Sequence, residues 1–487
     1  MKRAEITVFL SMVLILTVSF ILGIIEITVI HTSKAMSRLE TDRAVFSIFG
    51  EYQKELLEDY HVFSIEGTYE TGNFSEDRLI GRMLYYGTGN TDHEITGMQF
   101  LTDNRGQAFR EQVLTYMEEC YGIGLIRDFI GITEEWEEQC IEGEKMRAEE
   151  EKLTAQFKEL KETAEEASSD LPEEELSEIP EAGDTGTGNP FYCLEQIEKS
   201  GLLSVVMPQD MELSGKEIDL EKQVSMRSVN TGYGRFPART GTDGIAERLL
   251  FNEYILQNFR NASGGRGSYT GNEDADARNA VEDQPRSLEY ETEYILSGKA
   301  SDKENLESVL TKIFLIRLAL NYVYLLGDSG KQAEAEALAA VISLLLLIPE
   351  GTEVIKQLIL FAWAAGESTA DIQTLLSGKK AALMKTNENW QVSLSDLLTP
   401  GSFSGKKGGE DIPGGVSYED YLRIFLFMED QNDTAMRALD RIEENLAAGH
   451  GMDWFRADYC VTKLELKNTG VIFGDLTYTY PVYFGYE

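Results

Sequence analysis

A long apolar stretch near the amino end constrains this chain more than any other feature. Residues 6–30 read ITVFLSMVLILTVSFILGIIEITVI, and Glu26 is the one charged side chain among them. Because a helix rises about 1.5 Å per residue, the stretch can cross the roughly 30 Å of hydrocarbon in a bilayer with some tilt. Its aliphatic and phenylalanine side chains favour insertion by about 6 kcal/mol in sum, whereas one carboxylate costs about 3 kcal/mol. A cleavable signal peptide would have a shorter apolar region followed by small residues, so we predict a retained transmembrane helix.

The charges on the two sides of this span do not decide its orientation. Lys2 and Arg3 precede it, and Lys34, Arg38 and Arg43 follow it. A short basic tail is difficult to translocate, whereas a large acidic domain crosses a membrane largely regardless of its charge. We therefore expect a single-pass protein of the cell membrane, with its amino terminus inside the cell and the bulk of the chain in an extracytoplasmic head.

The helical pattern continues beyond the span, without Pro or Gly, as far as Gly50. Met36, Leu39, Phe46 and Phe49 recur at three- and seven-residue spacings, which indicates an apolar stripe that leads from the membrane into water. We predict one helix from residue 6 to about residue 60, roughly 80 Å long, with its weakest point at the glycine. Two interpretations of the stripe stay open: it packs under the head of its own chain, or it assembles with other subunits.

Two carboxylates mark the ends of the span. Glu26 lies near its outer end, and Glu5 stands beside Arg3 at its inner boundary. An isolated charge in lipid is costly, so such a carboxylate either reaches the headgroups or pairs with a cation of a neighbouring subunit. Glu5 and Glu26 are therefore candidates for pairing in membrane assembly, and the headgroup alternative stays open.

The charge of the whole chain argues against one class of function. The 487 residues carry 84 acidic and 44 basic side chains, a formal net charge of −40. Nucleic-acid binders gain affinity from Lys and Arg side chains that displace counterions, so we expect no nucleic-acid partner. Apolar residues make up 42% of the chain, which is enough to bury a sizeable core outside the membrane.

We expect an α+β fold in five parts. They are a cytoplasmic tail (1–5), the transmembrane helix (6–30), a stalk helix with a small mixed α/β region (31–133), an acidic helix with a flexible linker (134–189), and a mainly helical α+β domain with strands at its edges and carboxyl end (190–487). The linker is rich in Pro, Gly and acidic residues, a composition that disfavours a packed core. In the mixed region, strand-like stretches at 62–70 and 94–103 accompany a helical pattern at 107–122.

Helices dominate the predicted carboxyl-terminal domain. We expect them at 191–201, 244–259, 416–430 and 434–449, and in a segment that begins at a capping box of Ser301 and Glu304 and runs to about Leu326. Two further apolar segments, 338–348 and 355–365, are too short to span a membrane and are predicted as core helices of a bundle. A more polar turn region is expected to begin at Trp363, Glu367 and Asp371.

Strands are expected at 202–208, 287–296 and in the tail 458–487. Within the second of these, Leu288, Tyr290, Thr292 and Tyr294 alternate with other residues at the period of a strand, although a helix stays open. The Gly-, Ser- and Asn-rich segments 227–244 and 261–286 are predicted as loops or disordered segments.

The motifs that usually carry catalysis or bind cofactors are missing from the sequence. None of the Gly-Lys pairs has the earlier glycine that a phosphate-binding loop requires, and neither His-Glu-x-x-His nor Gly-x-Ser-x-Gly occurs. The histidines His31, His61, His93 and His450 are scattered singly, which argues against a zinc site. We expect no cofactor, no metal and no enzymatic activity, while a pair of catalytic carboxylates stays open because 84 acidic residues offer many pairs.

Four cysteines, Cys120, Cys140, Cys193 and Cys460, are unevenly spaced and contain no Cys-x-x-Cys. Outside the membrane they could form one or two disulfides, and the sequence does not choose among the three full pairings. Buried free thiols are the alternative.

Several segments together resemble an uncharacterised family. Among them are EITVFLSMVLILTVSFILGIIE, DRAVFSIFGEYQKELLEDYHVFSIEG, NPFYCLEQIEKSGLLSVVMP, LEYETEYILSGKASDKENLESVLTKIFLIRLALN and SYEDYLRIFLFM. The family is a domain of unknown function in single-pass membrane proteins of clostridia and related Gram-positive bacteria. The resemblance implies an association with Tad-type (tight adherence) pilus and secretion systems, and the amino-terminal segment is similar to that of pseudopilin-like Tad proteins. It implies no catalytic residues, and MKRAE lacks the glycine of a pilin-type leader, so processing by a prepilin peptidase is not expected.

The residues and the resemblance together lead to one expected function and two alternatives. We expect a membrane-anchored, non-enzymatic pseudopilin-like or assembly component of a Tad-like pilus or secretion apparatus, with the membrane, other pilus or secretion subunits and copies of itself as partners. One alternative is an envelope-anchored sensor or adhesin whose head binds an extracellular ligand. The other is an envelope hydrolase, which would require a pocket with a carboxylate of raised pKa beside a second acid.

Overall fold

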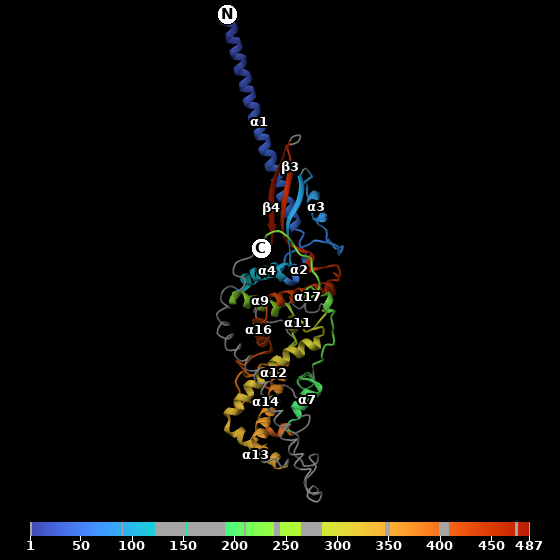
Figure 1. Cartoon of the computed structure of the whole chain (residues 1–487), viewed down its shortest axis with the longest axis vertical. Coiled ribbons are helices and arrows are strands. Elements are labelled where there is room, and N and C mark those ends of the chain that lie inside the picture. Colours follow the sequence, from blue (N-terminus) through green and yellow to red (C-terminus); the bar gives the residue numbers. More distant parts are fainter. Residues whose placement is uncertain are drawn as a thin grey trace.

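The computed structural model describes residues 2–89, 91–121, 152, 190–208, 211–237, 244–263, 285–345, 351–398, 409–472 and 476–486. The predicted acidic helix and linker at 134–189 lie outside the described residues, apart from residue 152, and so does Cys140. Within the described parts the molecule is elongated. A long helix, α1 (Lys2–Phe49), projects from one end, a small sheet lies beside the carboxyl-terminal part of this helix, and a helical head follows (Figure 1).

The remaining elements have the following bounds. The helices are α2 (Lys54–Tyr60), α3 (Glu76–Tyr85), α4 (Asp103–Tyr121), α7 (Tyr192–Ser200), α8 (Leu203–Val206), η2 (Leu220–Lys222), α9 (Ile245–Asn258), α11 (Glu291–Ser297), α12 (Asp302–Gly327), α13 (Ser329–Leu345), α14 (Thr352–Leu376), α15 (Leu394–Leu397), α16 (Tyr418–Met428), α17 (Gln431–His450) and η4 (Ala457–Tyr459). The strands are β1 (Ile65–Glu66), β2 (Thr91–Phe100), β3 (Cys460–Val471) and β4 (Thr477–Gly485). The predicted α+β class is thereby confirmed.

The sheet is built from both ends of the chain. The central strand β3 pairs antiparallel with β2 along one edge, from Thr91 opposite Gly470 to Phe100 opposite Val461. Its other edge pairs antiparallel with β4 and then with the short β1. The sequence analysis assigns β1 and β2 to the region 31–133 and β3 and β4 to the domain 190–487, so the sheet crosses that predicted boundary. The long-range pairing of β2 with β3 leaves no local signal in the sequence.

One face of the sheet is covered by the end of α1 and by α3. The small core between them consists of Val45, Ile48, Phe49, Ile65, Leu79, Met83, Ile95, Met98, Phe100, Val461, Leu464 and Leu466. The residues of α1 in this core recur at helical spacing, whereas those of the strands lie at strand positions that face inward. The sheet is therefore a platform on which the last turns of α1 rest.

The head has a separate and larger core, in which α12 packs against α11 and α14, and α13 covers α14. The helices predicted at 191–201, 244–259, 416–430 and 434–449 are confirmed as α7, α9, α16 and most of α17. Ser301 begins α12 as predicted, because its hydroxyl accepts a hydrogen bond from the backbone N–H of Glu304 at 3.2 Å. The tail, predicted to form strands, contains β3 and β4.

The predicted helix from residue 6 to about residue 60 is interrupted at its glycine. Gly50 still donates its backbone N–H to Phe46, but Glu51 bonds to Ile48 in a tighter turn, and the chain leaves the helix axis. The Glu51 carboxylate is then held by the guanidinium of Arg82 and, at 2.6 Å, by the hydroxyl of Tyr86, both at the end of α3. These contacts of Glu51 with α3 stabilise the turn after α1, and the chain becomes helical again in α2.

Two predicted strands are helices in the structure. The segment predicted as a strand at 202–208 contains the short helix α8, and the alternating segment 287–296 contains α11. In α11 the polar Glu291 and Glu293 are as fully buried as Tyr294 and Ile295. A helix that is enclosed on all sides has no solvent face to produce a period of 3.6, so the short alternation was misleading.

Candidate functional site

The apolar part of α1 is a candidate membrane span. None of its most apolar window is buried by the rest of the chain, and large aliphatic side chains are exposed all round the helix from Ile6 to Ile27. The hydroxyls of Ser11, Thr17 and Thr28 donate to carbonyl oxygens one turn earlier, at 2.7–2.8 Å, so these polar groups need no water. A helix of this kind is covered only by lipid or by other apolar helices.

A second helix, α12, is also long and apolar enough to cross a membrane. Most of its apolar window is buried, however, and it packs against α11 and α14 inside the head. We therefore interpret α12 as the central core helix of the head.

The two carboxylates at the ends of the span are described to different extents. Glu26 is exposed on α1, four residues before the end of the predicted span. The backbone of Glu5 belongs to α1, but its side chain lies outside the described residues. The structure thus places Glu26 on the outer surface of the anchor, where a headgroup or another subunit can reach it.

The junction between α1 and the sheet begins with a polar contact. The hydroxyls of Thr41 and Tyr480 lie 2.7 Å apart, and Tyr480 donates to the carbonyl oxygen of Ser37 at 3.0 Å. Arg38 lies over the ring of Tyr480 at 5.4 Å, and Lys34 lies over the ring of Tyr478 at 5.3 Å. These cation–π contacts attach both basic side chains to β4.

The junction continues with an aromatic cluster further from the membrane. Phe49 is 3% exposed, and its ring centroid lies 4.7 Å from that of Phe484 and 4.9 Å from that of Tyr486. The Tyr486 hydroxyl also donates to the backbone carbonyl of Phe49 at 2.5 Å. Together with the polar contact, this cluster fixes α1 along the length of β4.

The predicted stalk stripe divides between two faces of α1. Met36, Leu39 and Phe46 are 53%, 64% and 67% exposed, whereas Phe49 is buried against the sheet. The face that the head does bury is formed by Thr41, Ala44, Val45, Ile48 and Phe49. These five residues follow the helical spacing i, i+3, i+4, i+7, i+8, which is the spacing of one buried helix face. The sequence therefore carries a signal for this face, which differs from the predicted stripe. Met36 and Leu39 lie on the face that points away from the sheet, whereas the Phe46 ring lies at the edge of that face and meets Phe484 of β4 edge-on, with the centroids 6.0 Å apart.

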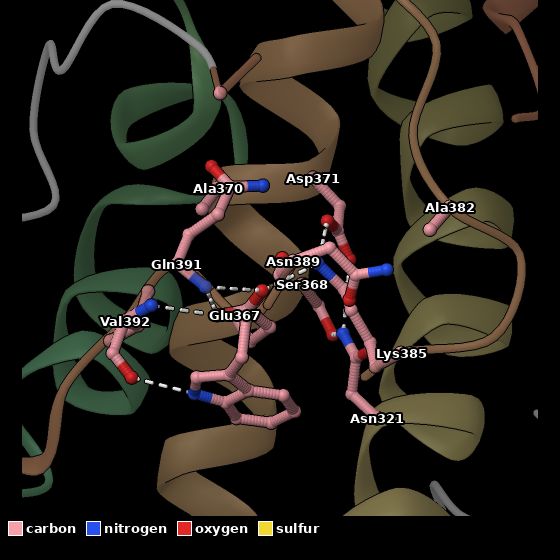
Figure 2. A network of polar contacts seen from close by, with 12 residues as sticks. Asn321, Glu367, Ser368, Ala370, Asp371, Ala382, Lys385, Asn389, Gln391 and Val392 are labelled. Carbon is pink, nitrogen blue, oxygen red and sulfur yellow. Dashed lines mark hydrogen bonds and ion pairs between the residues drawn. The ribbon is translucent and has the colours of Figure 1, made fainter. Parts of the chain in front are cut away.

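A second constellation of charged side chains lies deep in the head. Glu367 and Asp371 stand one turn apart on α14, and Lys385 bonds to both of them, at 2.5 Å and 2.7 Å (Figure 2). Arg317 of α12 approaches Asp371 to 2.6 Å. All four side chains are at most 1% exposed. The predicted polar turn at Trp363, Glu367 and Asp371 is wrong, since these residues lie in the middle of a core helix.

The cluster holds the segment after α14 against the head. Glu367 accepts the backbone N–H groups of Gln391 and Val392 at 3.0 Å and 2.8 Å, and the Trp363 indole donates to the carbonyl of Val392 at 2.7 Å (Figure 2). Burial and the neighbouring Asp371 charge raise the pKa of Glu367. Burial also opposes ionisation of Asp371, but Arg317 and Lys385 outweigh it and lower the pKa of that carboxyl.

Two carboxylates with pKa values pushed apart would suit acid–base catalysis if their oxygens could reach a substrate. All four carboxylate oxygens of Glu367 and Asp371 accept hydrogen bonds from the protein. Both side chains are fully buried. No oxygen is left for a substrate, and we therefore interpret the cluster as a structural tie between α12, α14 and the following segment.

The three cysteines that the structure describes are free thiols rather than disulfide partners of one another. Cys120 is an exposed free thiol, and Cys193 and Cys460 are buried free thiols. Burial raises the pKa of Cys193 to about 12 and that of Cys460 well above its usual value, so neither is a ready nucleophile. Among the described residues, no group of His, Cys, Asp and Glu side chains could hold a metal ion. The Nδ1 atom of His93, for instance, lies 2.6 Å from the Oδ1 atom of Asn468, in a contact between β2 and β3.

The comparison with known protein families matches the head and does not extend to α1. A family model described as a family of unknown function (DUF5702) matches residues 180–471, which include every described element from α7 to the end of β3. No curated protein and no solved structure matches the chain. The coarse part of the resemblance, an uncharacterised domain, is thereby confirmed.

The aromatic cluster at the junction predicts unequal effects of two substitutions on α1. Phe49→Ala should lower the free energy of unfolding by about 3–5 kcal/mol, because it leaves a cavity beneath Phe484 and Tyr486. The matched control Leu39→Ala should change it by about 0.5 kcal/mol or less, since this side chain is exposed. Thermal unfolding of the full-length protein in detergent measures both. Equal effects of the two substitutions would contradict the junction described above.

The buried cluster predicts a strong and pH-dependent effect of removing its lysine. Lys385→Met should destabilise the head by about 3–5 kcal/mol at neutral pH, because two buried carboxylates lose their shared cation. The raised pKa of Glu367 rises further in the variant, so this carboxyl becomes protonated above its usual pKa of about 4.5 and the repulsion is relieved. The loss should therefore shrink as the pH falls toward about 4.5.

The control for this prediction is Lys467→Met, which removes an exposed ion pair with Glu94 and should cost at most about 1 kcal/mol. Chemical denaturation at several pH values compares the two variants. A small loss for Lys385→Met, independent of pH, would show that the cluster is not ionised as described.

Proposed function

This chain belongs to the DUF5702 family, and we propose that it is a membrane-anchored, non-enzymatic, pseudopilin-like assembly component of a Tad-like pilus or secretion apparatus. In this proposal α1 crosses the cell membrane once, the amino terminus is inside, and the sheet and head are extracytoplasmic. The observation that carries it is the apolar face of α1 that remains exposed above the span, formed by Met36, Leu39 and Phe46.

The position of this face follows from the continuity of α1. The helix runs from Lys2 to Phe49 without interruption, so the head is attached to the span by a rigid rod. Leu39 lies nine residues beyond Ile30, which is about 14 Å above the end of the apolar span. In every copy anchored in one membrane, the exposed face therefore lies at the same height, and parallel helices of neighbouring copies can meet there.

The same chain leaves most of this face uncovered, and its one ring contact there is that of Phe46 with the edge of β4 at Phe484. Val45, Ile48 and Phe49 lie on the side of the helix where the sheet packs. Large apolar side chains that stay in water forgo about 25 cal/mol for each Å² that a partner could bury. Three such side chains spaced along one helix beside a membrane are typical of a lateral contact between helices. The preferred occupant is the corresponding helix of a second subunit.

The head supports a role in assembly rather than in catalysis. Its most conspicuous pair of carboxylates, Glu367 and Asp371, is fully bonded and buried. The link to a Tad-like apparatus rests on the resemblance of the amino-terminal segment to pseudopilin-like proteins. The amino-in orientation rests on the short basic tail and the acidic bulk, with a formal net charge of −40 for the chain.

A crosslinking experiment tests the lateral contact. In a background in which Cys120 and Cys140 are replaced by serine, Leu39→Cys in native membranes should give disulfide-linked dimers on mild oxidation, because two parallel copies bring this position together. The matched control is Leu84→Cys, an exposed leucine on α3. Dimers from Leu84 alone, or none from either position, would refute lateral packing through this face.

The same assay assigns a role to Glu26. If this carboxylate pairs with a cation of a neighbouring subunit, Glu26→Gln should weaken the Leu39 crosslink, since the amide keeps the shape and removes the charge. An unchanged crosslink would assign Glu26 to the lipid headgroups instead. Mass spectrometry of proteins that copurify with the full-length chain should identify pilus or secretion subunits, and their absence would restrict the assembly to copies of this chain.

A further inference from the structure

The strand β4 runs alongside α1 in the same direction, and the contacts between them are in register. Lys34 lies over Tyr478, Arg38 over Tyr480, and Phe49 packs on Phe484. From Lys34 to Arg38 the helix rises about 6 Å, and the two strand residues from Tyr478 to Tyr480 rise about 6.6 Å. Helix and strand thus advance at matching rates, four residues of α1 for two residues of β4.

This register determines the height along α1 of the end of the β3–β4 hairpin where β3 leads into β4. Leu476 precedes Tyr478 by two residues, so it lies at the level of about residue 30 of α1. Residue 30 is the end of the apolar span. Figure 1 shows the hairpin beside α1, with this end directed toward the amino end of the helix. The described end of the hairpin is therefore level with the surface of the membrane that α1 crosses.

The side chains at this end are apolar. Val471 and Leu476 are 51% and 50% exposed, and Ile472 between them is half-buried. The backbone N–H of Ile472 donates to the carbonyl of Leu476 at 3.0 Å, which closes the hairpin with paired backbone groups. Paired backbone and exposed aliphatic side chains lower the cost of entering the interfacial layer of a bilayer.

Next to this end, Tyr478, Lys34 and Arg38 have the composition of a membrane interface, whereas Tyr480 is 2% exposed and bonded to α1. Tyr478 and Tyr480 stack at 5.5 Å, and the Lys34 and Arg38 side chains lie over their rings. Gly470 faces Tyr478, and a Cβ there would come within 2.7 Å of the ring, so glycine leaves room for the tyrosine. Tyr rings and long basic side chains gather at the headgroup level, where the ring is half in apolar surroundings and the cation meets lipid phosphates.

We propose that the end of the β3–β4 hairpin where β3 leads into β4, at Val471, Ile472 and Leu476, contacts the lipid headgroup layer beside α1 and gives the head a second attachment to the membrane. The inference rests on the proposed anchoring by α1. The occupant is the bilayer rather than a second copy, because the register relates this end to the membrane of its own chain. Two points of attachment restrain both the tilt of α1 and the rotation of the head about it.

Fluorescence quenching by lipid tests the contact on the full-length protein in vesicles of phosphatidylcholine and phosphatidylglycerol. Cys120 and Cys140 are replaced by serine, and an environment-sensitive fluorophore is attached to Leu476→Cys. Leu16→Cys in the span and Leu344→Cys, an exposed leucine of α13 at the far end of the head, are the matched controls. Val471→Cys on the neighbouring strand is a second reporter in case the first variant does not fold.

Lipids that carry a nitroxide near the headgroup should quench most of the emission from position 476 or 471 and leave position 344 unchanged. Quenching at 16 by nitroxides deeper in the acyl chain, with none at 476 and 471, would overturn the hairpin contact and leave the anchor intact. No quenching at 16 would overturn the anchor and the hairpin contact together. Quenching at 476 that falls as the amount of protein per vesicle rises would point to a second copy as the occupant and would also overturn the proposal.

Discussion

The packing of the last turns of α1 against the sheet is the interaction on which the arrangement of this molecule depends. Phe49 and its neighbours meet a strand, β4, whose residues follow them by more than 400 positions in the chain. The central strand β3 also comes from the far end, although its partner β2 belongs to the amino-terminal part. Because these contacts are so distant in sequence, the junction can form only when nearly the whole chain is available.

This dependence links the membrane to the head. A continuous α1 transmits the position of the span to the sheet, and the sheet rests on the helical head through α2, α4 and η4. Inside the head, Lys385 and Arg317 offset the charges of Glu367 and Asp371 and tie two core helices to the segment that follows them. The described elements thus connect the candidate span in α1 to the far end of the head without a break in packing.

Much of this architecture could be predicted from local patterns, and the exceptions have physical causes. The long apolar helix α1 follows from hydropathy, and α9, α16 and α17 follow from helical spacing and turn signals. The pattern failed in α11, where Glu291 and Glu293 are buried like their apolar neighbours. It also failed at Glu367 and Asp371, which look like a polar turn because their partners Arg317 and Lys385 lie on other segments. The pairing of β2 with β3 and the buried face of α1 required the structure.

The central claim is that the apolar part of α1 is a permanent membrane anchor. Alkaline extraction of membranes from cells that produce the full chain tests it most directly, with a variant that lacks residues 6–30 as the comparison. The full chain should stay with the membrane pellet at its full length, since a helix embedded in lipid resists extraction, and the shortened variant should be released. Full-length chain in the extracted fraction, or a membrane-bound variant without residues 6–30, would contradict the account.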